Sequence, residues 1–443
     1  MARFLRRTIV ELPPWLILAT AWLLVIVFAY PGQLTFDSLG YFVQAHASEY
    51  SDVHPPAVAA FWHALEYVVA GPFGMLLVQT TTFLVGLFFV FHAVLSRRAA
   101  AWAAAAVFVF PPVMAPMAMI WKDSLMAGCL MLGLGTLLLA EGRARFVGIA
   151  CLIAAIAFRS MATAAVAPIV IVLFDVGVPG WRRYAAATAI WLGMTVAAWG
   201  VNRVLVDHEM SPWTTTVAVH DIAGTLAYLD RDLGDAELRD MLAGTDMLVD
   251  THIHDRMRAI YRPGEYLPII ADPRLSIWTL PIVGFVPAPP AQLEALRRSW
   301  WKVVSHHPIG YLEHRVSVFA EVLSNGGAIM GRTNIDKDAR LLLGLSVRSS
   351  DLQLALVKKL LKLERSTPLF SPFVYFVVAC ILLGFAVRDR VARLVLATGL
   401  GLEVAVFFNA TGRDYRYSHW MICCTCVALI LVIARRARIG ASA

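Results

Sequence analysis

The amino-acid sequence predicts an all-α polytopic membrane protein with about ten transmembrane helices. Apolar residues make up 59% of the 443-residue chain, charged residues make up 16%, and the mean hydropathy is +0.67. A soluble chain of this length carries more charge. Several apolar runs approach or reach the roughly 20 residues that cross a bilayer. Because these runs lack the alternation of barrel strands, we expect the spans to be helical.

The predicted spans are the apolar runs between the polar loops. We place them at residues 13–30, 74–95, 100–117, 124–141, 145–159, 161–176, 184–203, 368–387, 391–408 and 418–435. They divide the chain into three parts, which are residues 1–203 with a first outer loop at 31–73, a large outer segment at 204–367, and residues 368–443. All six cysteines fall within spans, so neither a disulfide framework nor a zinc site is expected.

Clusters of arginine predict the orientation of the spans. They occupy every second connection, at Arg3, Arg6 and Arg7, at Arg97 and Arg98, at Arg143 and Arg145, at Arg182 and Arg183, at Arg388, Arg390 and Arg393, and at Arg435, Arg436 and Arg438. Such clusters collect on the cytoplasmic side, and ten spans with both termini cytoplasmic place all six clusters there. The net charge of +7 is then explained by topology, and nucleic acid is not an expected partner.

The segment 57–70 of the first outer loop is interpreted as an interfacial helix. A full span there would put Arg97 and Arg98 on the outer side. Apolar residues, among them Trp62 and Leu65, recur at helical spacing on one side of the segment, which is typical of a helix that lies on the membrane surface. A second surface helix is expected within residues 341–363, where leucines alternate with lysines.

The large outer segment at 204–367 is expected to be mainly helical. It contains His220 and Asp221, which are candidates for substrate contacts, and the paired Trp300 and Trp301, which indicate an interfacial anchor. Other histidines and carboxylates follow, but without the repeated spacing of a dedicated zinc site. We therefore predict neither a metal site nor a cofactor, while the sequence leaves dependence on a divalent ion open.

Asp37 is a candidate general base, because it follows the first apolar run by a few residues and so lies just outside the bilayer. The same outer loop contains His54, which is a candidate for orienting a carboxylate or a substrate hydroxyl, and it contains no Lys or Arg. The alternative interpretation is that Asp37 caps the next helix, expected at 38–47, by accepting a hydrogen bond from a backbone N–H.

Four cations depart from the rule that outer connections are poor in Lys and Arg. They are Lys122, Arg159, Arg413 and Arg416, each at the outer end of a predicted span. Cations near the membrane plane are costly unless they face an anion or water, so they mark a functional site, and an anionic lipid head group is the expected partner. The alternative is local pairing, with Asp123 beside Lys122 and Asp414 beside Arg413, while the other cations reach lipid phosphates.

These features together resemble the GT-C fold of polyprenyl-phosphate-sugar-dependent glycosyltransferases, which include protein O-mannosyltransferases and bacterial aminoarabinose transferases. The resemblance covers nearly the whole chain and rests on the first-loop acid, the interfacial helices, about ten spans and the large outer segment. Relatives usually carry Asp-Glu at the first-loop acid, whereas Asp37 is followed by Ser38. Segments 121–124 and 414–417, the latter including Tyr417, resemble outer-loop motifs of bacterial GT-C-like proteins.

The resemblance implies an inverting enzyme of the bacterial inner membrane whose active site faces the periplasm. It would move a sugar from a polyprenyl-phosphate donor to a hydroxyl group of a lipid, glycan or protein acceptor, in contact with membrane lipids. Asp37 would act as the base. The candidates for holding the donor phosphate are Lys122, Arg159, Arg413 and Arg416, and the candidates for other substrate contacts are His54, Asp123, His220, Asp221 and Tyr417.

Two alternatives use some of the same features. One is a transporter or flippase for a lipid-linked anion, in which the cations would guide the head group. The other is an enzyme similar to O-antigen ligases, which would take a diphosphate-linked donor and use a late outer histidine such as His306 or His307. The charges lie at one face rather than in mid-bilayer, and the two halves of the chain show no repeat, so transport is the less favoured function.

Overall fold

The computed structural model describes residues 12–174, 177, 179–229, 233–247, 252–266, 268–269, 287–324, 349–386 and 389–442. Within these ranges the regular secondary structure is helical, and the β-type contacts are three isolated bridges. The prediction of an all-α fold is confirmed. The first arginine cluster, Arg388 of the fifth cluster and the start of the surface helix at 341–363 lie outside the described residues.

The structure describes the following helices, given in chain order. They are α2 (Pro14–Ala29), α3 (Phe36–Ala47), α4 (Pro56–Glu66), α5 (Pro72–His92), α6 (Arg97–Val109), α7 (Pro111–Met117), α8 (Lys122–Leu139), η1 (Gly142–Ala144), α9 (Arg145–Phe158), α10 (Ala162–Leu173), α11 (Trp181–Leu205), η2 (Trp213–Ala218), α12 (Val219–Ala227), α13 (Asp235–Met241), α14 (Ile253–Ile260), α16 (Pro290–His306), α17 (Pro308–Val322), α19 (Asp351–Ser366), η3 (Pro368–Phe370), α20 (Pro372–Phe385), α21 (Arg390–Asn409), η5 (Tyr415–Ser418) and α22 (His419–Ser442).

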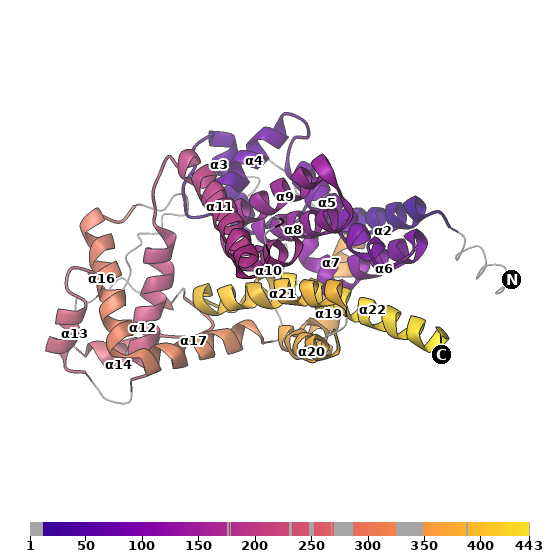
Figure 1. Ribbon diagram of the computed structural model, residues 1–443. Coiled ribbons are helices and arrows are strands. Elements are labelled where there is room, and N and C mark those ends of the chain that lie inside the picture. Colours follow the sequence, from indigo (N-terminus) through magenta and orange to yellow (C-terminus); the bar gives the residue numbers. More distant parts are fainter. Residues whose placement is uncertain are drawn as a thin grey trace.

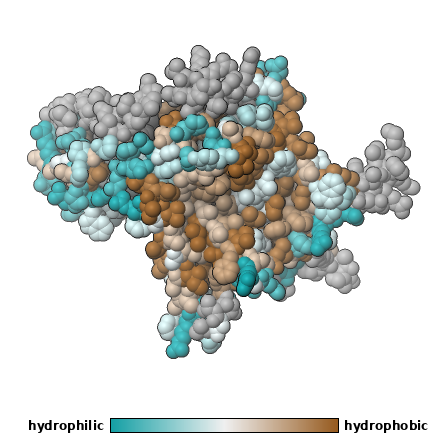
Figure 2. Space-filling view, turned by 90° about the horizontal axis from the view of Figure 1, so that it is seen from above, coloured by the Kyte–Doolittle hydropathy of each residue, from teal (hydrophilic) through white to brown (hydrophobic). Residues whose placement is uncertain are grey.

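The molecule is a multi-pass membrane protein. By length and apolar composition, α5, α8, α11, α21 and the stretch Tyr415–Ala437 can each cross a bilayer, and the bent pair α6–α7 makes a sixth span if it is counted as one. The helices α2, α10 and α20 are apolar but shorter. Hydrophobic side chains cover the middle of the molecule (Figure 2), as a lipid-facing belt requires. The count of ten spans stays a prediction.

The segment 100–117, expected as one span, is bent by 70° between α6 and α7. Pro111 and Pro112 explain the break, because proline removes a helical hydrogen bond and disfavours helical backbone in the residue before it. The bend turns the backbone of α7 toward the site described below. There, the Pro116 carbonyl accepts a hydrogen bond from Ser124 Oγ at 2.7 Å.

Arginines from three of the predicted clusters meet at one end of the helix bundle. Arg145 donates to the Leu173 carbonyl at 3.0 Å, while Arg183 and Arg390 donate to the Val172 carbonyl at 3.4 and 2.7 Å. The start of α2 and the end of α22 lie near each other at one edge of the molecule (Figure 1). Three loops that are far apart in the sequence therefore share one side, as the predicted topology requires.

A second group of helices, α12, α13, α14 and α16, lies at the opposite end of the molecule (Figure 1). It has its own hydrophobic core, whose fully buried members include Ile222, Leu226, Leu238, Leu296 and Val303. Helix α17 connects this group to the bundle, since it packs against α12 at one end and contacts α21. The described part of the large outer segment is thus mainly helical, as predicted.

Helices α3 and α4 form the first outer loop and pack against each other. Pro56 begins α4, since proline suits the first position of a helix, and Val58 and Trp62 are fully buried on its apolar side. Helix α19 corresponds to the second predicted surface helix and is anchored by Gln353, which donates to the Tyr30 carbonyl at 2.6 Å. The position of these helices at a membrane surface stays a prediction.

Candidate active site

The start of α8 and the first outer loop are joined by backbone and side-chain hydrogen bonds. The Ile120 N–H donates to the Gln33 carbonyl at 2.9 Å, and the Ser38 hydroxyl donates to the Ile120 carbonyl at 2.6 Å. Trp121 Nε1 donates to the Thr35 hydroxyl at 2.9 Å. These bonds bring the loop after the first span next to the residues that begin α8.

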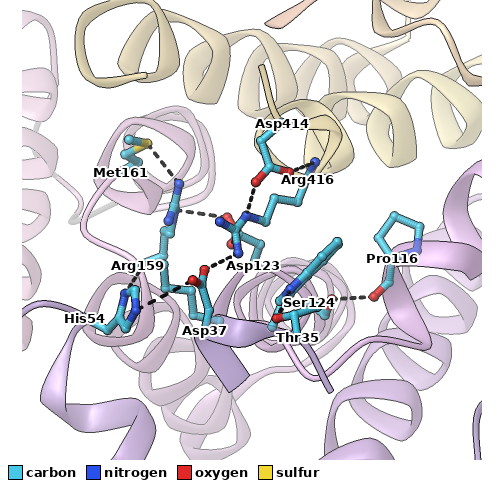
Figure 3. Close-up of polar contacts among 12 residues, drawn as sticks. Thr35, Asp37, His54, Pro116, Asp123, Ser124, Arg159, Met161, Asp414 and Arg416 are labelled. Atoms are coloured by element: carbon cyan, nitrogen blue, oxygen red, sulfur yellow. Dashed lines mark hydrogen bonds and ion pairs between the residues drawn. The ribbon is translucent and has the colours of Figure 1, made fainter. Parts of the chain in front are cut away.

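Asp37 lies in the first turn of α3, but it does not cap that helix. The cap is Thr35, whose side chain accepts from the Ser38 N–H in a capping box. The Asp37 carboxylate instead pairs with the Arg416 guanidinium, which comes from the other end of the chain (Figure 3). The Asp37 side chain is 25% exposed, so it is not sealed inside the fold.

His54 and Lys122 complete a line of polar contacts to Asp37. Lys122 Nζ donates to His54 Nδ1 at 2.9 Å, and His54 Nε2 lies 3.9 Å from Asp37 Oδ1. With Lys122 protonated, its ammonium group can only donate, so Nδ1 accepts and the imidazole proton is on Nε2, facing Asp37. Tyr41 packs edge-on against the His54 ring at a centroid distance of 4.8 Å. It lies one helical turn after Asp37.

Arg159 and Arg416 are held by carboxylates and aromatic rings. Arg159 Nε pairs with Asp123 Oδ1 at 3.0 Å, and Arg416 Nε pairs with Asp414 Oδ2 at 2.7 Å (Figure 3). The Arg159 guanidinium lies over the Tyr417 ring at 5.2 Å from its centroid. Arg416 lies at the same distance over Trp121. Stacking on rings leaves guanidinium edges available for an oxyanion.

The charges of this cluster balance formally. Three carboxylates, Asp37, Asp123 and Asp414, face three cations, Lys122, Arg159 and Arg416. The two arginines pair with carboxylates, whereas the described partner of Lys122 is the neutral His54. Lys122 is only 8% exposed, so its charge is poorly solvated. An anionic group that enters this cluster therefore finds Lys122 without an ion-pair partner among the described residues.

The surroundings set the ionisation of Asp37 and His54. Burial raises the pKa of Asp37, but the charge of Arg416, smaller contributions from His54 and Lys122, and the hydrogen bond from Arg416 together outweigh burial and hold the pKa well below its ordinary value of 3.8. Burial lowers the pKa of His54 to about 3, and the charge of Lys122 acts in the same direction. Asp37 is therefore ionised and His54 neutral across the physiological range.

We expect the kcat/KM of the free protein to stay flat on the acid side down to about pH 4, because neither Asp37 nor His54 takes up a proton above that value. Both pKa values are lower in the folded chain than in the unfolded one, so the stability they contribute is present at neutral pH and is lost as pH falls below 6.5 for His54 and below 3.8 for Asp37. A pH profile with an acid limb near 6.5 would contradict this assignment.

The structure brings together seven of the ten residues singled out as site candidates in the sequence. They are Asp37, His54, Lys122, Asp123, Arg159, Arg416 and Tyr417. Arg413 differs from the other three cations, since its side chain is exposed. Its backbone N–H donates to the Gly264 carbonyl at 2.8 Å. The interpretation that Asp414 pairs with Arg413 is replaced by the pair of Asp414 with Arg416.

His220 and Asp221 are placed elsewhere, which corrects their assignment to the same site. Both are buried in α12, where Asp221 contacts His314, Arg315 and Trp300 and His220 contacts the Arg262 carbonyl. The adjacent His-Asp pair in the sequence gave no indication of these partners, which lie between 42 and 94 positions further along the chain.

Two members of the cluster were not expected from the sequence. Asp414 is half-buried against Arg416, and Trp121 supplies a ring beneath the same guanidinium. Trp121 and Asp414 lie in the two outer-loop segments that carry the family resemblance. Each is within two positions of a candidate cation, Lys122 or Arg416, and this proximity in the sequence could have indicated that they belong to the site. Among the described residues, no group of three or more His, Cys, Asp or Glu side chains is arranged to hold a metal ion.

No protein-family model matches the chain, and no curated protein matches it. Solved structures similar to it include two of ArnT. They are crystal structures of ArnT from Cupriavidus metallidurans, in the apo state and bound to undecaprenyl phosphate. The first is 14% identical, with 93% of this chain and 76% of that chain covered, and the second is 16% identical, with 95% and 78% covered. The TM-score is 0.33 in both cases, which is too low to support a statement about function.

Proposed function

We propose that the protein is an integral membrane glycosyltransferase that moves a sugar from a polyprenyl-phosphate donor to an acceptor hydroxyl, with inversion at the anomeric carbon. The observation that carries the proposal is the meeting of Asp37, Lys122, Arg159 and Arg416 in one cluster. These residues come from four separate connections between apolar helices. Buried cations beside a partly exposed carboxylate suit a reaction in which phosphate leaves and a hydroxyl loses its proton.

The chemical step follows from this arrangement. The acceptor oxygen attacks the anomeric carbon, the bond from that carbon to the phosphate oxygen breaks, and its electron pair leaves with the phosphate. Asp37 takes the proton of the acceptor hydroxyl. Lys122, Arg159 and Arg416 stabilise the negative charge that develops on the departing phosphate. Attack from the face opposite the phosphate inverts the configuration of the sugar.

The ion pair between Asp37 and Arg416 gives the donor a second role. A carboxylate held by a guanidinium is a weak base, because its proton affinity is low. A donor phosphate bound beside Lys122 would compete with Asp37 for the Arg416 guanidinium and would weaken the ion pair between Arg416 and Asp37. The pKa of Asp37 then rises, so the base becomes stronger when the donor is bound. We therefore expect the acid limb of kcat to lie at higher pH than that of kcat/KM.

The lipid tail and the orientation fit the same proposal. An apolar cavity of about 380 Å³ lies between α19, α20 and α22 and is lined by Leu369, Tyr375 and Cys426, among others. Phe370, next to the lining residue Leu369, packs against Tyr415 with the two ring centroids 6.2 Å apart, and Tyr415 directly precedes Arg416. We assign the arginine end of the bundle to the cytoplasm, and under this assignment the cluster would face the periplasm at a bacterial inner membrane.

The proposal is tested by offering the purified protein in nanodiscs a panel of polyprenyl-phosphate-linked hexoses and the matching polyprenyl-diphosphate sugars. Release of polyprenyl phosphate from at least one monophosphate donor is the expected result. Turnover of diphosphate donors alone would favour the enzyme similar to O-antigen ligases. Movement of the lipid across the bilayer of a proteoliposome without cleavage would favour the transporter.

A further inference from the structure

A buried polar cluster surrounds Asp221 in the outer group of helices. His314 Nε2 donates to Asp221 Oδ1 at 3.0 Å, and Trp300 Nε1 donates to Oδ2 at 2.8 Å. Tyr261 lies 2.7 Å from His314 Nδ1, and since Nε2 carries the imidazole proton, the Tyr261 hydroxyl is the donor. Asp221 is 1% exposed and His314 is fully buried. No ligand can reach these groups, so the cluster is not a binding site.

Arg315 differs from the other members of the cluster because it also contacts a residue outside it. Its guanidinium pairs with Asp221, and its Nη1 donates to the Ala410 carbonyl at 2.8 Å. Ala410 is the C-cap residue that directly follows α21. The Arg315 side chain is fully buried, so this bond is shielded from water and the charge depends on Asp221 for compensation. The bond fixes the first residue of the loop 410–414.

The same loop is held at a second point by a chain segment next to the cluster. The Gly264 carbonyl accepts from the Arg413 N–H at 2.8 Å, and the neighbouring Arg262 carbonyl faces His220 Nε2 at 3.3 Å. Gly412 permits this close approach, because a Cβ there would lie 2.9 Å from the Gly264 oxygen. The loop is thus held at Ala410 and at Arg413, shortly before the η5 helix that carries Arg416.

We propose that Arg315, held by Asp221, is a positioning residue that fixes the loop 410–414 and thereby places the Arg416 guanidinium beside Asp37. The inference rests on the proposed function for its kinetic consequence. It assigns His220 and Asp221 to the support of the site rather than to contact with substrate. A purely structural role would stabilise the α12–α17 group without a specific effect on Arg416.

The first test does not depend on activity. Hydrogen–deuterium exchange is measured over peptides that contain residues 410–416 in the full-length protein and in its Arg315→Met, Arg315→Lys and Asp221→Asn variants. We expect exchange in this loop to rise about tenfold or more in Arg315→Met, and less in Arg315→Lys, which keeps a charged N–H donor. The control is Lys302→Met, which removes an exposed ion pair with Asp240 in the same group of helices. Unchanged exchange at 410–416 would overturn the proposal.

The second test is a double-mutant cycle with Arg416→Lys. Arg315→Met is expected to lower kcat by about 10- to 100-fold with little change in KM, because a small misplacement of a charged group weakens the transition state more than the ground state. In the Arg416→Lys background the same change should cost less than about threefold. Equal losses in both backgrounds would show a general structural role and overturn the proposal.

Failure of folding and failure of the proposed function lead to different results. If Arg315→Met fails to fold, the exchange measurement and the double-mutant cycle are made with Asp221→Asn instead. This substitution preserves the shape of the side chain and a hydrogen-bond acceptor. If the unmodified protein turns over no donor, the proposed function fails, while the exchange measurement still decides whether Arg315 positions the loop.

Discussion

Replacing Asp37 with asparagine is expected to lower kcat by about 100- to 10,000-fold, the range that general-base catalysis contributes. The amide keeps the shape of the side chain but cannot take up the proton of the acceptor hydroxyl. The fold should persist, since Thr35 rather than Asp37 caps α3 and Arg416 retains Asp414 as a partner. Turnover is measured as the release of polyprenyl phosphate by the purified variant in nanodiscs.

Binding of the donor separates loss of the base from loss of the site. Asp37→Asn removes a negative charge beside Arg416, so the affinity for polyprenyl phosphate should rise rather than fall. Glu49→Gln is a matched control, because Glu49 is an exposed acid of the same outer loop that faces His208. Wild-type turnover by Asp37→Asn would remove Asp37 from the mechanism.

Replacing Arg416 with glutamine should have the next largest effect. Arg416 contacts Asp37 and Asp414 and is the cation nearest the base, so it is expected to stabilise the departing phosphate directly. Loss of one such preorganised group typically costs about 100- to 1,000-fold in rate. We therefore expect kcat/KM to fall by about that factor. Two carboxylates also lose their cation, so the melting temperature should fall.

Two further variants separate charge from folding in this experiment. Arg416→Lys keeps the charge but not the planar guanidinium that stacks on Trp121, and its activity should lie between those of the wild type and Arg416→Gln. Arg203→Gln removes an exposed arginine paired with Glu209 at the end of α11 and should leave turnover within about twofold of the wild type. Equal turnover in Arg416→Gln and Arg203→Gln would argue against a role for Arg416 in phosphate transfer.

The sequence predicted the composition of the cluster because topology restricts where charges can lie. Once the arginine loops are assigned to one side, Asp37, Lys122, Arg159 and Arg416 all fall at the opposite ends of their helices. Four helix ends on one face of a bundle can share a site. The departures from the arginine rule were therefore a stronger signal than any local motif.

Other features depended on contacts that no local pattern encodes. The pair of Asp37 with Arg416 joins residues 379 positions apart, and the ion pair of Asp221 with Arg315 joins α12 to α17. His220 and Asp221 are residue types that often form functional sites, but both side chains are buried, and their burial could not be predicted from the sequence. The bend at α6–α7 did have a local signal, because Pro111 and Pro112 interrupt the apolar run. The prediction of a single span at 100–117 followed the hydrophobic residues on both sides of these prolines and missed the bend.

The most direct measurement is an experimental structure of the full-length protein with polyprenyl phosphate bound. The account predicts a phosphate within hydrogen-bond distance of Lys122 Nζ and of a guanidinium nitrogen of Arg416, with the contact between Arg416 and Asp37 lengthened or broken. A phosphate bound away from these residues, with the Asp37–Arg416 pair intact, would contradict it.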